Sequence, residues 1–318
     1  MTPFFSVVIP VYNRASLLGA ALSSVLVQGE QDFEIVVVDD GSRDDPKAVV
    51  DALADPRIRY LRRDNRGGGA ARNTGIREAQ GRFIAFLDSD DAFLAGHLAA
   101  MRKLLDGTTR TAGYARILVD RGDSRTILKP PRALRSGEDM ASYLLCDRGF
   151  VPTITTVVPA DLAKATLYAE NLREAEDTDF AIRLALAGCA FVMAEAPGAI
   201  WRDHSDPNRQ SAGRSSARMA EWLDAMKPRI PRKAWLGGRG WAVAKGIAPR
   251  HPLRALGYYL SAVWNGCYPA GLAAIVFLQI FLPDAVYRAV ADHAIGWLRI
   301  GLQPATDERA AIPTERPC

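Results

Sequence analysis

The N-terminal third of the chain alternates between short apolar runs and longer segments in which apolar residues recur every three or four positions. Each short run is rich in β-branched residues and ends at Gly or polar residues, which predicts a buried strand. The longer segments have helical spacing, as at Leu18, Leu22 and Val25. Strands that alternate with helices predict βαβ units and a mostly parallel sheet. The expected strands are Phe4–Val11, Phe33–Val38, Ile58–Leu61 and Phe83–Leu87, and the expected helices cover residues 17–26, 46–53 and 70–80.

Three of these strands end in polar side chains. Tyr12–Asn13 follows the first strand, Asp39–Asp40 the second, and Asp88–Asp90 the fourth. In sheets of this kind, ligands bind outside the carboxyl ends of the strands. We therefore expect the three polar segments to meet in one crevice.

After Leu105 the elements become shorter. Ala115–Val119 and Arg125–Leu128 are expected to form a hairpin, and Thr153–Val158 another strand. A helix is expected to begin at Glu176 and to end at Gly188, a residue type that often terminates helices. Two short strands, 190–194 and 199–201, then lead to His204.

The C-terminal third is basic and helical at first and then strongly apolar. No charged residue occurs between Arg254 and Asp284, a span longer than the ~20 residues that a helix needs to cross a bilayer. Several Gly residues and Pro269 interrupt the span, and a second amphipathic segment follows over 286–298. Three interpretations remain open: a spanning helix, a segment lying on the membrane surface, or an apolar tail packed on the domain or on a partner.

Composition narrows the class of protein. The 318 residues are 48% hydrophobic and 24% charged, as in a globular protein, and the formal net charge is only +4. This excess is too weak to indicate nucleic acid as a partner. The four cysteines are widely spaced and the N-terminus lacks a signal-peptide pattern, so we expect a cytoplasmic protein without a zinc site or disulfide framework.

The fourth strand ends in an Asp-X-Asp motif with three carboxylates in four positions: Asp88, Asp90 and Asp91. Packing does not explain this cluster, because like charges repel one another unless a cation or solvent balances them. Mg²⁺ or Mn²⁺ held by carboxylates and substrate phosphates would provide the balance. The alternative is a solvated turn in which Asp91 caps the next helix.

Five motifs follow one another along the chain: Ser6–Arg14, Val38–Ser42, Ala71–Ile76, Phe86–Asp91 and Glu176–Phe180. In this order they resemble the motifs of family 2 glycosyltransferases of the GT-A fold. The resemblance covers roughly the first two-thirds of the chain. It implies a nucleotide-binding part over 1–110 and an acceptor part over 111–213, followed by a helical, partly apolar extension over 214–318.

The resemblance implies that a sugar is transferred from a nucleotide diphosphate sugar, usually UDP-linked, with inversion at the anomeric carbon. Asp39 then accepts a hydrogen bond from the uracil ring, Asp88 contacts the ribose, and Asp90 binds the metal together with Asp88. Tyr12 is suited to stacking on the base, with plain edge packing as the alternative. The residues expected to bind the donor are Pro10, Tyr12, Asn13, Asp39, Gly68, Arg72, Asn73, Asp88 and Ser89.

Three consecutive glycines, Gly67–Gly69, precede the helix that carries Arg72. Glycines allow the backbone to approach a ligand closely, and a helix N-terminus favours phosphate. The alternative is a flexible loop with a solvated Arg72.

Asp177 is the expected catalytic base, since an inverting transfer needs a group to take the proton of the acceptor hydroxyl. Acidic residues also occur in first helical turns simply because they complement the helix dipole. Glu176 and Asp179 are interpreted as helpers or solvated caps. His204 falls where some members of the family place a third metal ligand, although a lone His is more often an ordinary surface or core residue.

The expected acceptor is a saccharide or a lipid-linked saccharide of cell-surface polysaccharide or glycolipid synthesis. The C-terminal extension would hold the enzyme near the inner face of the cell membrane. Two other functions compete with this one: a nucleotidyltransferase that makes a sugar nucleotide, and a non-catalytic relative that only binds one.

Overall fold

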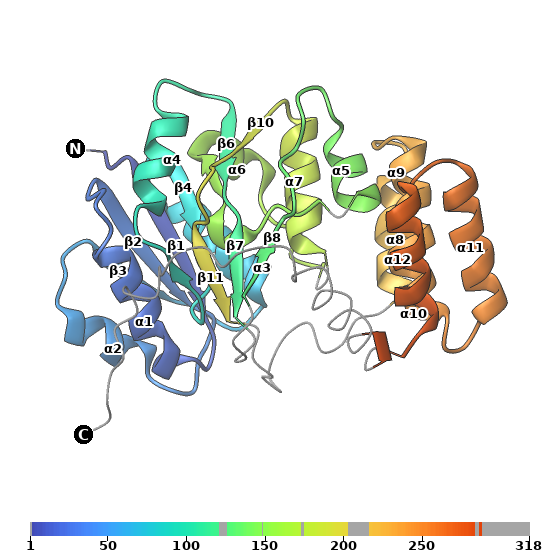
Figure 1. The fold of residues 1–318 in the computed structure, drawn as a ribbon. Coiled ribbons are helices and arrows are strands. Elements are labelled where there is room, and N and C mark those ends of the chain that lie inside the picture. The colour runs from blue at the N-terminus through green and yellow to red at the C-terminus, as the bar shows by residue number, and fades with distance from the viewer. Residues whose placement is uncertain are drawn as a thin grey trace.

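The computed structural model describes residues 2–120, 126–147, 149–172, 175–202, 216–283 and 286–287. A mostly parallel seven-stranded sheet forms the centre of the molecule (Figure 1). The parallel strands β1 to β4 confirm the predicted α/β architecture, and β9 is the one strand antiparallel to its neighbours β4 and β6. In sheet order the strands are β10 (Ala190–Met193), β6 (Thr111–Tyr114), β9 (Val157–Pro159), β4 (Phe83–Phe86), β1 (Phe5–Val11), β2 (Phe33–Asp39) and β3 (Ile58–Arg62).

Both faces of this sheet are covered, which explains why its strands are apolar without alternation. Val7 and Ile35 face one core together with α1 (Ala15–Leu26), α2 (Pro46–Leu53) and α4 (His97–Leu105). Val8 and Val36 face the other core with α3 (Gly68–Glu78), α6 (Ala160–Thr166) and α7 (Glu176–Leu186). Successive residues of a strand point to opposite faces, so one apolar run serves both cores.

A smaller four-stranded sheet lies over the first core. It contains β5 (Ala92–Phe93), β11 (Ala199–Arg202), β7 (Ile117–Asp120) and β8 (Thr126–Lys129). The antiparallel pair of β7 and β8 confirms the predicted hairpin.

The strand predicted over Thr153–Val158 is wrong in its first half. Thr153–Thr155 form a 3₁₀ helix, and β9 begins only at Val157. The Thr156 hydroxyl donates to the Pro152 carbonyl at 2.7 Å, and the Thr155 hydroxyl donates to the Ala115 carbonyl at 2.8 Å. Threonine side chains can bind nearby backbone in this way and so compete with strand pairing.

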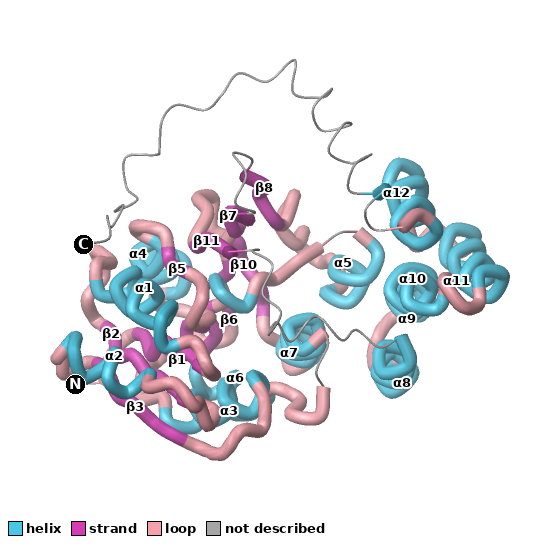
Figure 2. The backbone as a smooth tube through the Cα atoms, turned by 90° about the horizontal axis from the view of Figure 1, so that it is seen from below, coloured by secondary structure: helices cyan, strands magenta, loops and turns pink. Residues whose placement is uncertain are grey.

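The C-terminal helices form a layer at one end of the molecule, beyond α5 (Met140–Cys146) and α7 (Figures 1 and 2). Trp222, Leu223 and Tyr268 of this layer share a hydrophobic core with Tyr143 and Ile182. The predicted boundary at residue 213 lies outside the described residues. The helices are α8 (Ser216–Met226), α9 (Arg232–Gly238), a π-helical stretch (Arg239–Val243), α10 (Ala244–Ile247), α11 (Pro252–Trp264) and α12 (Ala270–Phe281).

The long uncharged span is divided between α11 and α12, which are separated by a turn at Gly266 with φ of 63°. None of the helices in the described parts of the chain is both long and apolar enough to cross a membrane. Cys146, Cys189 and Cys267 are buried free thiols.

Candidate active site

The polar ends of β1 and β2 are joined directly to one another. Val11 is paired with Asp39 across the two strands, and the Asp40 N–H donates to the Val11 carbonyl at 2.9 Å. Asn13 adopts a left-handed conformation with φ of 52°. Its N–H donates to the Ser42 hydroxyl at 3.0 Å, and its side-chain oxygen accepts from the Arg43 N–H at 2.8 Å. The predicted meeting of these two strand ends is confirmed.

Pro10 and Tyr12 lie on either side of Val11. Pro10 is half-buried in β1 opposite Val38, and the Tyr12 side chain is 43% exposed. Part of the Tyr12 side chain is therefore accessible to a ligand.

Asp39 is completely buried, and three donors contact its carboxylate. Oδ1 accepts from the Ser42 N–H at 2.8 Å, and Oδ2 accepts from the Tyr60 hydroxyl at 2.6 Å and from Arg62 at 3.2 Å. Burial would raise the pKa of Asp39, but the hydrogen bonds from Ser42 and Tyr60 and the charge of Arg62 outweigh it and lower the pKa. Asp39 is thus a fixed anion.

Tyr60 and Arg62 were not expected at this site from the sequence. They lie two residues apart on β3 and therefore point to the same face, with Arg62 in register with Asp39. Burial, followed by the bond to Asp39, raises the pKa of Tyr60 to about 12, so Tyr60 remains a donor. The available signal in the sequence was that Tyr60 and Arg62 lie on either side of Leu61 and so share one face of β3.

Asp40 shapes the glycine loop. Its carboxylate accepts from the backbone N–H groups of Arg66 and Gly67, and Arg63 lies 3.2 Å away. Gly67 has a φ of 95°, a conformation that favours glycine, and Gly68 begins α3. This loop is therefore held in place by a buried carboxylate, and the flexible-loop alternative does not describe it.

Arg72 is buried and connects Asp88, which follows β4, with Glu176 at the start of α7. It donates to Asp88 at 2.6 Å and to Glu176 at 3.3 Å, and its guanidinium lies 5.5 Å from the centre of the Tyr168 ring. Burial would lower the pKa of Arg72, but the charges of Asp88, Asp177 and Glu176 raise it. The solvated Arg72 of the alternative interpretation is wrong.

Asn73, the neighbour of Arg72, is almost fully buried. Its amide donates to the Tyr168 carbonyl at 2.9 Å and accepts from the Tyr168 N–H at 2.7 Å. These bonds fix Tyr168 beside Arg72, so Asn73 acts on the crevice by positioning another residue.

Glu176 and Asp177 lie in the first turn of α7, which faces Arg72. Burial raises the pKa of Glu176 to about 7, against a partial opposing effect of Arg72. Burial also raises the pKa of Asp177, and Asp88 adds to this effect, whereas Arg72 and a hydrogen bond with Thr153 oppose it. Raised pKa values of this kind suit groups that accept a proton near neutral pH.

Below this turn, Phe180 anchors the helix. Its ring stacks on Tyr168 at 4.1 Å between ring centres and meets Phe86 edge-on at 6.0 Å.

The interpretation of Asp179 as a solvated cap or helper is wrong, because Asp179 is buried. Its carboxylate accepts from Arg183 at 2.7 Å and from the Trp222 indole at 2.9 Å, which fastens α7 to α8.

The carboxylates after β4 have different surroundings. Asp88 and Asp90 are half-buried, and Asp90 lies 2.9 Å from Arg14, a residue that our sequence-based site did not include. Asp91 is buried and accepts from the Arg202 N–H at 3.0 Å. The next helix begins at His97, so Asp91 does not cap it and that alternative is wrong. Ser89 is buried between the two aspartates.

Carboxylate oxygens are the ligand type that Mg²⁺ and Mn²⁺ prefer, and in the structure Arg72 faces Asp88 and Arg14 faces Asp90. Burial, followed by the charges of Asp88 and Asp90, raises the pKa of Asp91 well above its usual range. The described part of the chain contains no group of three or more metal-binding side chains. His204, the third ligand expected, lies outside the described residues.

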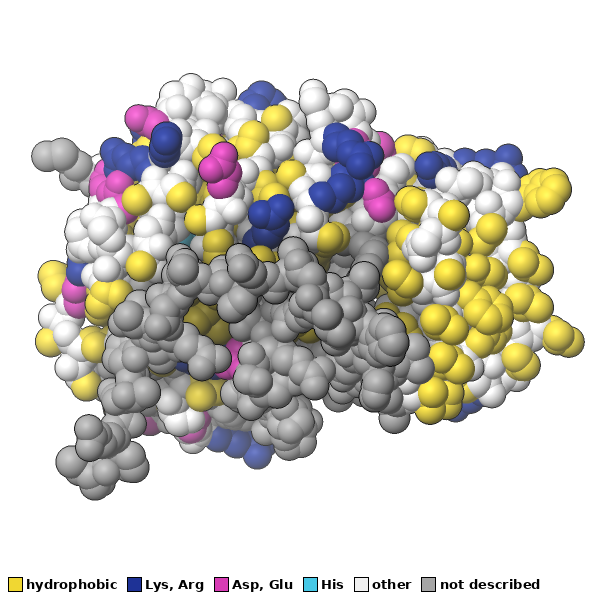
Figure 3. Space-filling view, viewed as in Figure 1, with side chains coloured by type: hydrophobic (Ala, Val, Ile, Leu, Met, Phe, Trp, Pro, Cys, Tyr) yellow, Lys and Arg dark blue, Asp and Glu magenta, His cyan; other side chains and the backbone are white. Residues whose placement is uncertain are grey.

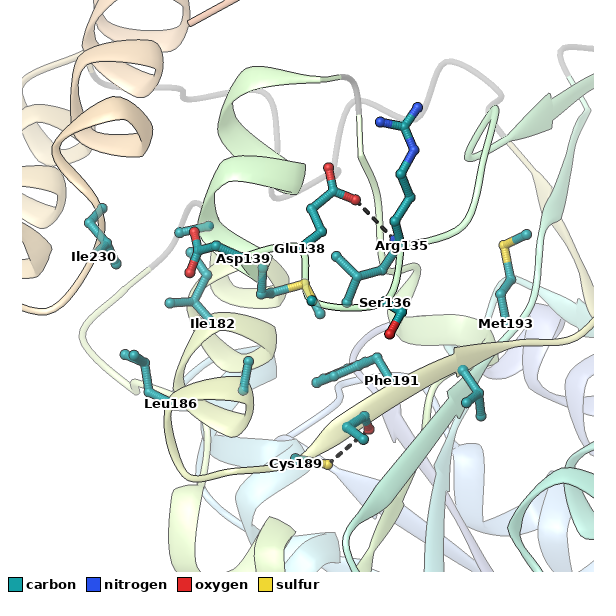
Figure 4. A pocket seen from close by; sticks show the side chains of 17 residues that line it. Arg135, Ser136, Glu138, Asp139, Ile182, Leu186, Cys189, Phe191, Met193 and Ile230 are labelled. Carbon is teal, nitrogen blue, oxygen red and sulfur yellow. Dashed lines mark hydrogen bonds between the residues drawn. The ribbon is translucent and has the colours of Figure 1, made fainter.

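A cavity of about 690 Å³ lies elsewhere, along the edge strand β10 and the C-terminal half of α7 (Figure 4). Ile182, Leu186, Phe191 and Met193 line it, together with Ile230 from the C-terminal layer. Because Glu176 and Asp177 are at the opposite end of α7, this cavity is not the site at the strand ends.

Comparisons with known proteins place this chain among glycosyltransferases. Residues 6–153 match the family model "Glycosyl transferase family 2". The amylovoran biosynthesis glycosyltransferase AmsB of Erwinia amylovora is 30% identical over 240 residues, which cover 72% of this chain and 79% of AmsB. A GalNAc(5)-diNAcBac-PP-undecaprenol beta-1,3-glucosyltransferase of Campylobacter jejuni is 40% identical over 116 residues, 35% of this chain and 38% of that protein. Two rickettsial uncharacterized glycosyltransferases match over only 28% of their own length.

Among solved structures, S. aureus TarS 1–349 in complex with UDP-GlcNAc has a TM-score of 0.64 at 17% identity, with 86% of each chain covered. This similarity supports the GT-A fold. The match to AmsB over most of both chains shows that the protein belongs to glycosyltransferase family 2.

Proposed function

We propose that the protein is an inverting, metal-dependent glycosyltransferase that moves a sugar from a UDP-linked donor to an acceptor hydroxyl. The observation that supports this proposal best is the convergence of Arg72, Asp88 and Glu176 from three elements, with Asp177 beside them. The similar proteins AmsB and the Campylobacter jejuni enzyme are glycosyltransferases by name, so a nucleotidyltransferase or a non-catalytic relative is not favoured.

In the proposed reaction, Asp177 takes the proton of the acceptor hydroxyl while that oxygen forms a bond to the anomeric carbon. The bond from this carbon to the diphosphate breaks, and its electron pair leaves with the nucleotide. Asp39 accepts from the base and Asp88 from the ribose. A divalent cation held by Asp88 and Asp90 would supply positive charge to the leaving diphosphate.

We assign the acceptor to saccharides or lipid-linked saccharides of cell-surface polysaccharide or glycolipid synthesis. The names of the relatives support this class, since one acts in amylovoran biosynthesis and the other carries a PP-undecaprenol substrate in its name. Such an enzyme would work in the cytoplasm at the inner face of the cell membrane, with the C-terminal helices as the contact.

The test is a nucleotide-release assay on the full chain with a panel of UDP-, GDP- and other nucleotide sugars. We expect release of UDP from a UDP-sugar with Mn²⁺ or Mg²⁺ and none in excess EDTA. Release from a GDP-sugar alone would contradict the donor assignment, and undiminished release in EDTA would contradict the metal.

A further inference from the structure

Helix α11 has an exposed apolar ridge on its outer face. Leu253, Leu260 and Trp264 are 83%, 53% and 92% exposed, and their spacing of seven and four residues places them on one side of the helix. The opposite side, with Ala255, Tyr259 and Ala262, is buried. Figure 3 shows hydrophobic side chains gathered over α11 and α12 at this end of the molecule.

The sequence around the ridge is strongly cationic. Between Asp224 and Asp284 there are eight Lys and Arg residues and no Asp or Glu. Arg250 and Arg254, at the start of α11, are exposed beside Leu253. A helix with exposed Trp and Leu on one side and basic residues nearby has the composition of an interfacial membrane helix.

We propose that α11 docks the protein on an anionic lipid bilayer. The ridge of Leu253, Leu260 and Trp264 enters the boundary between headgroups and acyl chains, where Trp side chains are favoured. Arg250 and Arg254 lie against the lipid phosphates. This inference deepens the proposed function, since a lipid-linked acceptor is held in such a bilayer.

The positive charge around the ridge favours a lipid bilayer as its partner over a second copy of the chain. A two-fold contact through this ridge would bring the cationic region of one copy against that of the other, and juxtaposed like charges weaken association. An anionic lipid surface has the complementary charge. Helix α12 buries Leu272, Val276 and Ile280 in the core of the C-terminal layer and exposes Phe277 at 41%, so it adds a smaller apolar surface next to α11.

The experiment is co-sedimentation of the full chain with vesicles of phosphatidylcholine alone or mixed with phosphatidylglycerol. We expect binding to the mixed vesicles that weakens as salt is raised. The double variant Leu260→Ser/Trp264→Ser should lose at least about tenfold in partitioning, equivalent to ~1.4 kcal/mol. The matched control is Val27→Ser, which alters a residue 78% exposed on another part of the surface and should bind like the wild type.

A second variant, Arg250→Glu, leaves the apolar ridge intact and should reduce the preference for phosphatidylglycerol. Equal binding to both kinds of vesicle, or unchanged binding of the double variant, would overturn the proposal. A wild-type dimer in light scattering that the double variant converts to monomer would overturn it in favour of a second copy.

Nucleotide release in solution separates this inference from the proposed function. We expect the double variant to release UDP like the wild type when no vesicles are present. A chain that binds vesicles but releases no nucleotide from any donor would retain the docking surface and refute the proposed function. A chain that releases nucleotide but does not bind anionic vesicles would support the proposed function and refute the docking surface.

Discussion

Asp39 and Asp177 are carboxylates of the candidate active site, yet their pKa values are shifted in opposite directions. Asp39 is fully buried and Asp177 is half-buried, and burial raises the pKa of each. Asp39 receives hydrogen bonds from Ser42 and Tyr60 as well as the charge of Arg62, and these lower its pKa. Asp177 has a hydrogen bond with Thr153 and the opposing charges of Arg72 and Asp88, and burial prevails.

The difference shows that the number of donors, and not the residue type, decides what a buried carboxylate can do. A carboxylate with several donors stays ionised and suits a ligand that donates a hydrogen bond. A carboxylate with few donors gains affinity for a proton and suits a base. This contrast supports the proposed roles of Asp39 in donor binding and of Asp177 as the base.

The largest expected effect comes from Asp177→Asn, which removes the base and keeps the shape of the side chain. We expect kcat to fall by about 10²- to 10⁴-fold, the usual contribution of a general base. Donor binding, measured by calorimetry with UDP, should persist. Turnover like that of the wild type would exclude Asp177 as the base.

The next largest expected effect is on the pH dependence of the free energy of unfolding, and it comes from Glu176→Gln. Because the pKa of Glu176 is raised to about 7 from 4.5, the folded protein binds this proton more tightly than the unfolded chain. Its stabilising contribution is present below about pH 4.5 and is lost as the pH rises through about 7, a change of about 3 kcal/mol. Glu176→Gln should flatten this part of the stability–pH curve in urea unfolding. An equally steep curve in the variant would contradict the raised pKa.

Asp39→Asn should weaken donor binding by about 10- to 100-fold, since a hydrogen bond to a charged group contributes ~1.5–3 kcal/mol. We expect KM for the UDP-sugar to rise and kcat to change little. Glu34→Gln is the matched control, because Glu34 is a buried carboxylate near the opposite end of β2, bonded to Ser6 and Arg59. An equal rise in KM for both variants would indicate a general loss of structure.

The smallest effect is expected for Arg72→Gln. The charge of Arg72 opposes the rise in the pKa of both Glu176 and Asp177. Its loss should move the ascending limb of the kcat–pH profile to higher pH and lower kcat at pH 7 by about tenfold, the scale of one lost charge-assisted hydrogen bond. Activity should partly recover at pH 9. A limb that moves to lower pH would contradict this arrangement of charges.

Much of the fold could be predicted because its signals are local. The buried strands β1, β2 and β4 appear as apolar runs, and helix α2 was predicted with its observed bounds, Pro46–Leu53. The predictions of secondary structure and burial were wrong where a side chain makes a hydrogen bond that the local sequence pattern does not show. Thr155 and Thr156 turn back to the backbone instead of extending β9, and Asp179 is buried by Trp222, which lies far along the chain.

The sequence by itself determined the fold class, the family and the meeting of the polar strand ends, because apolar periodicity and motif order are properties of neighbouring residues. Only the tertiary structure brought Tyr60 and Arg62 to Asp39, Arg14 to Asp90, and Arg72 between Asp88 and Glu176. It also decided that Leu272, Val276 and Ile280 of α12 are buried while Leu253, Leu260 and Trp264 of α11 are exposed. Burial and pairwise electrostatics depend on distances between remote residues, and these distances exist only once the chain has folded.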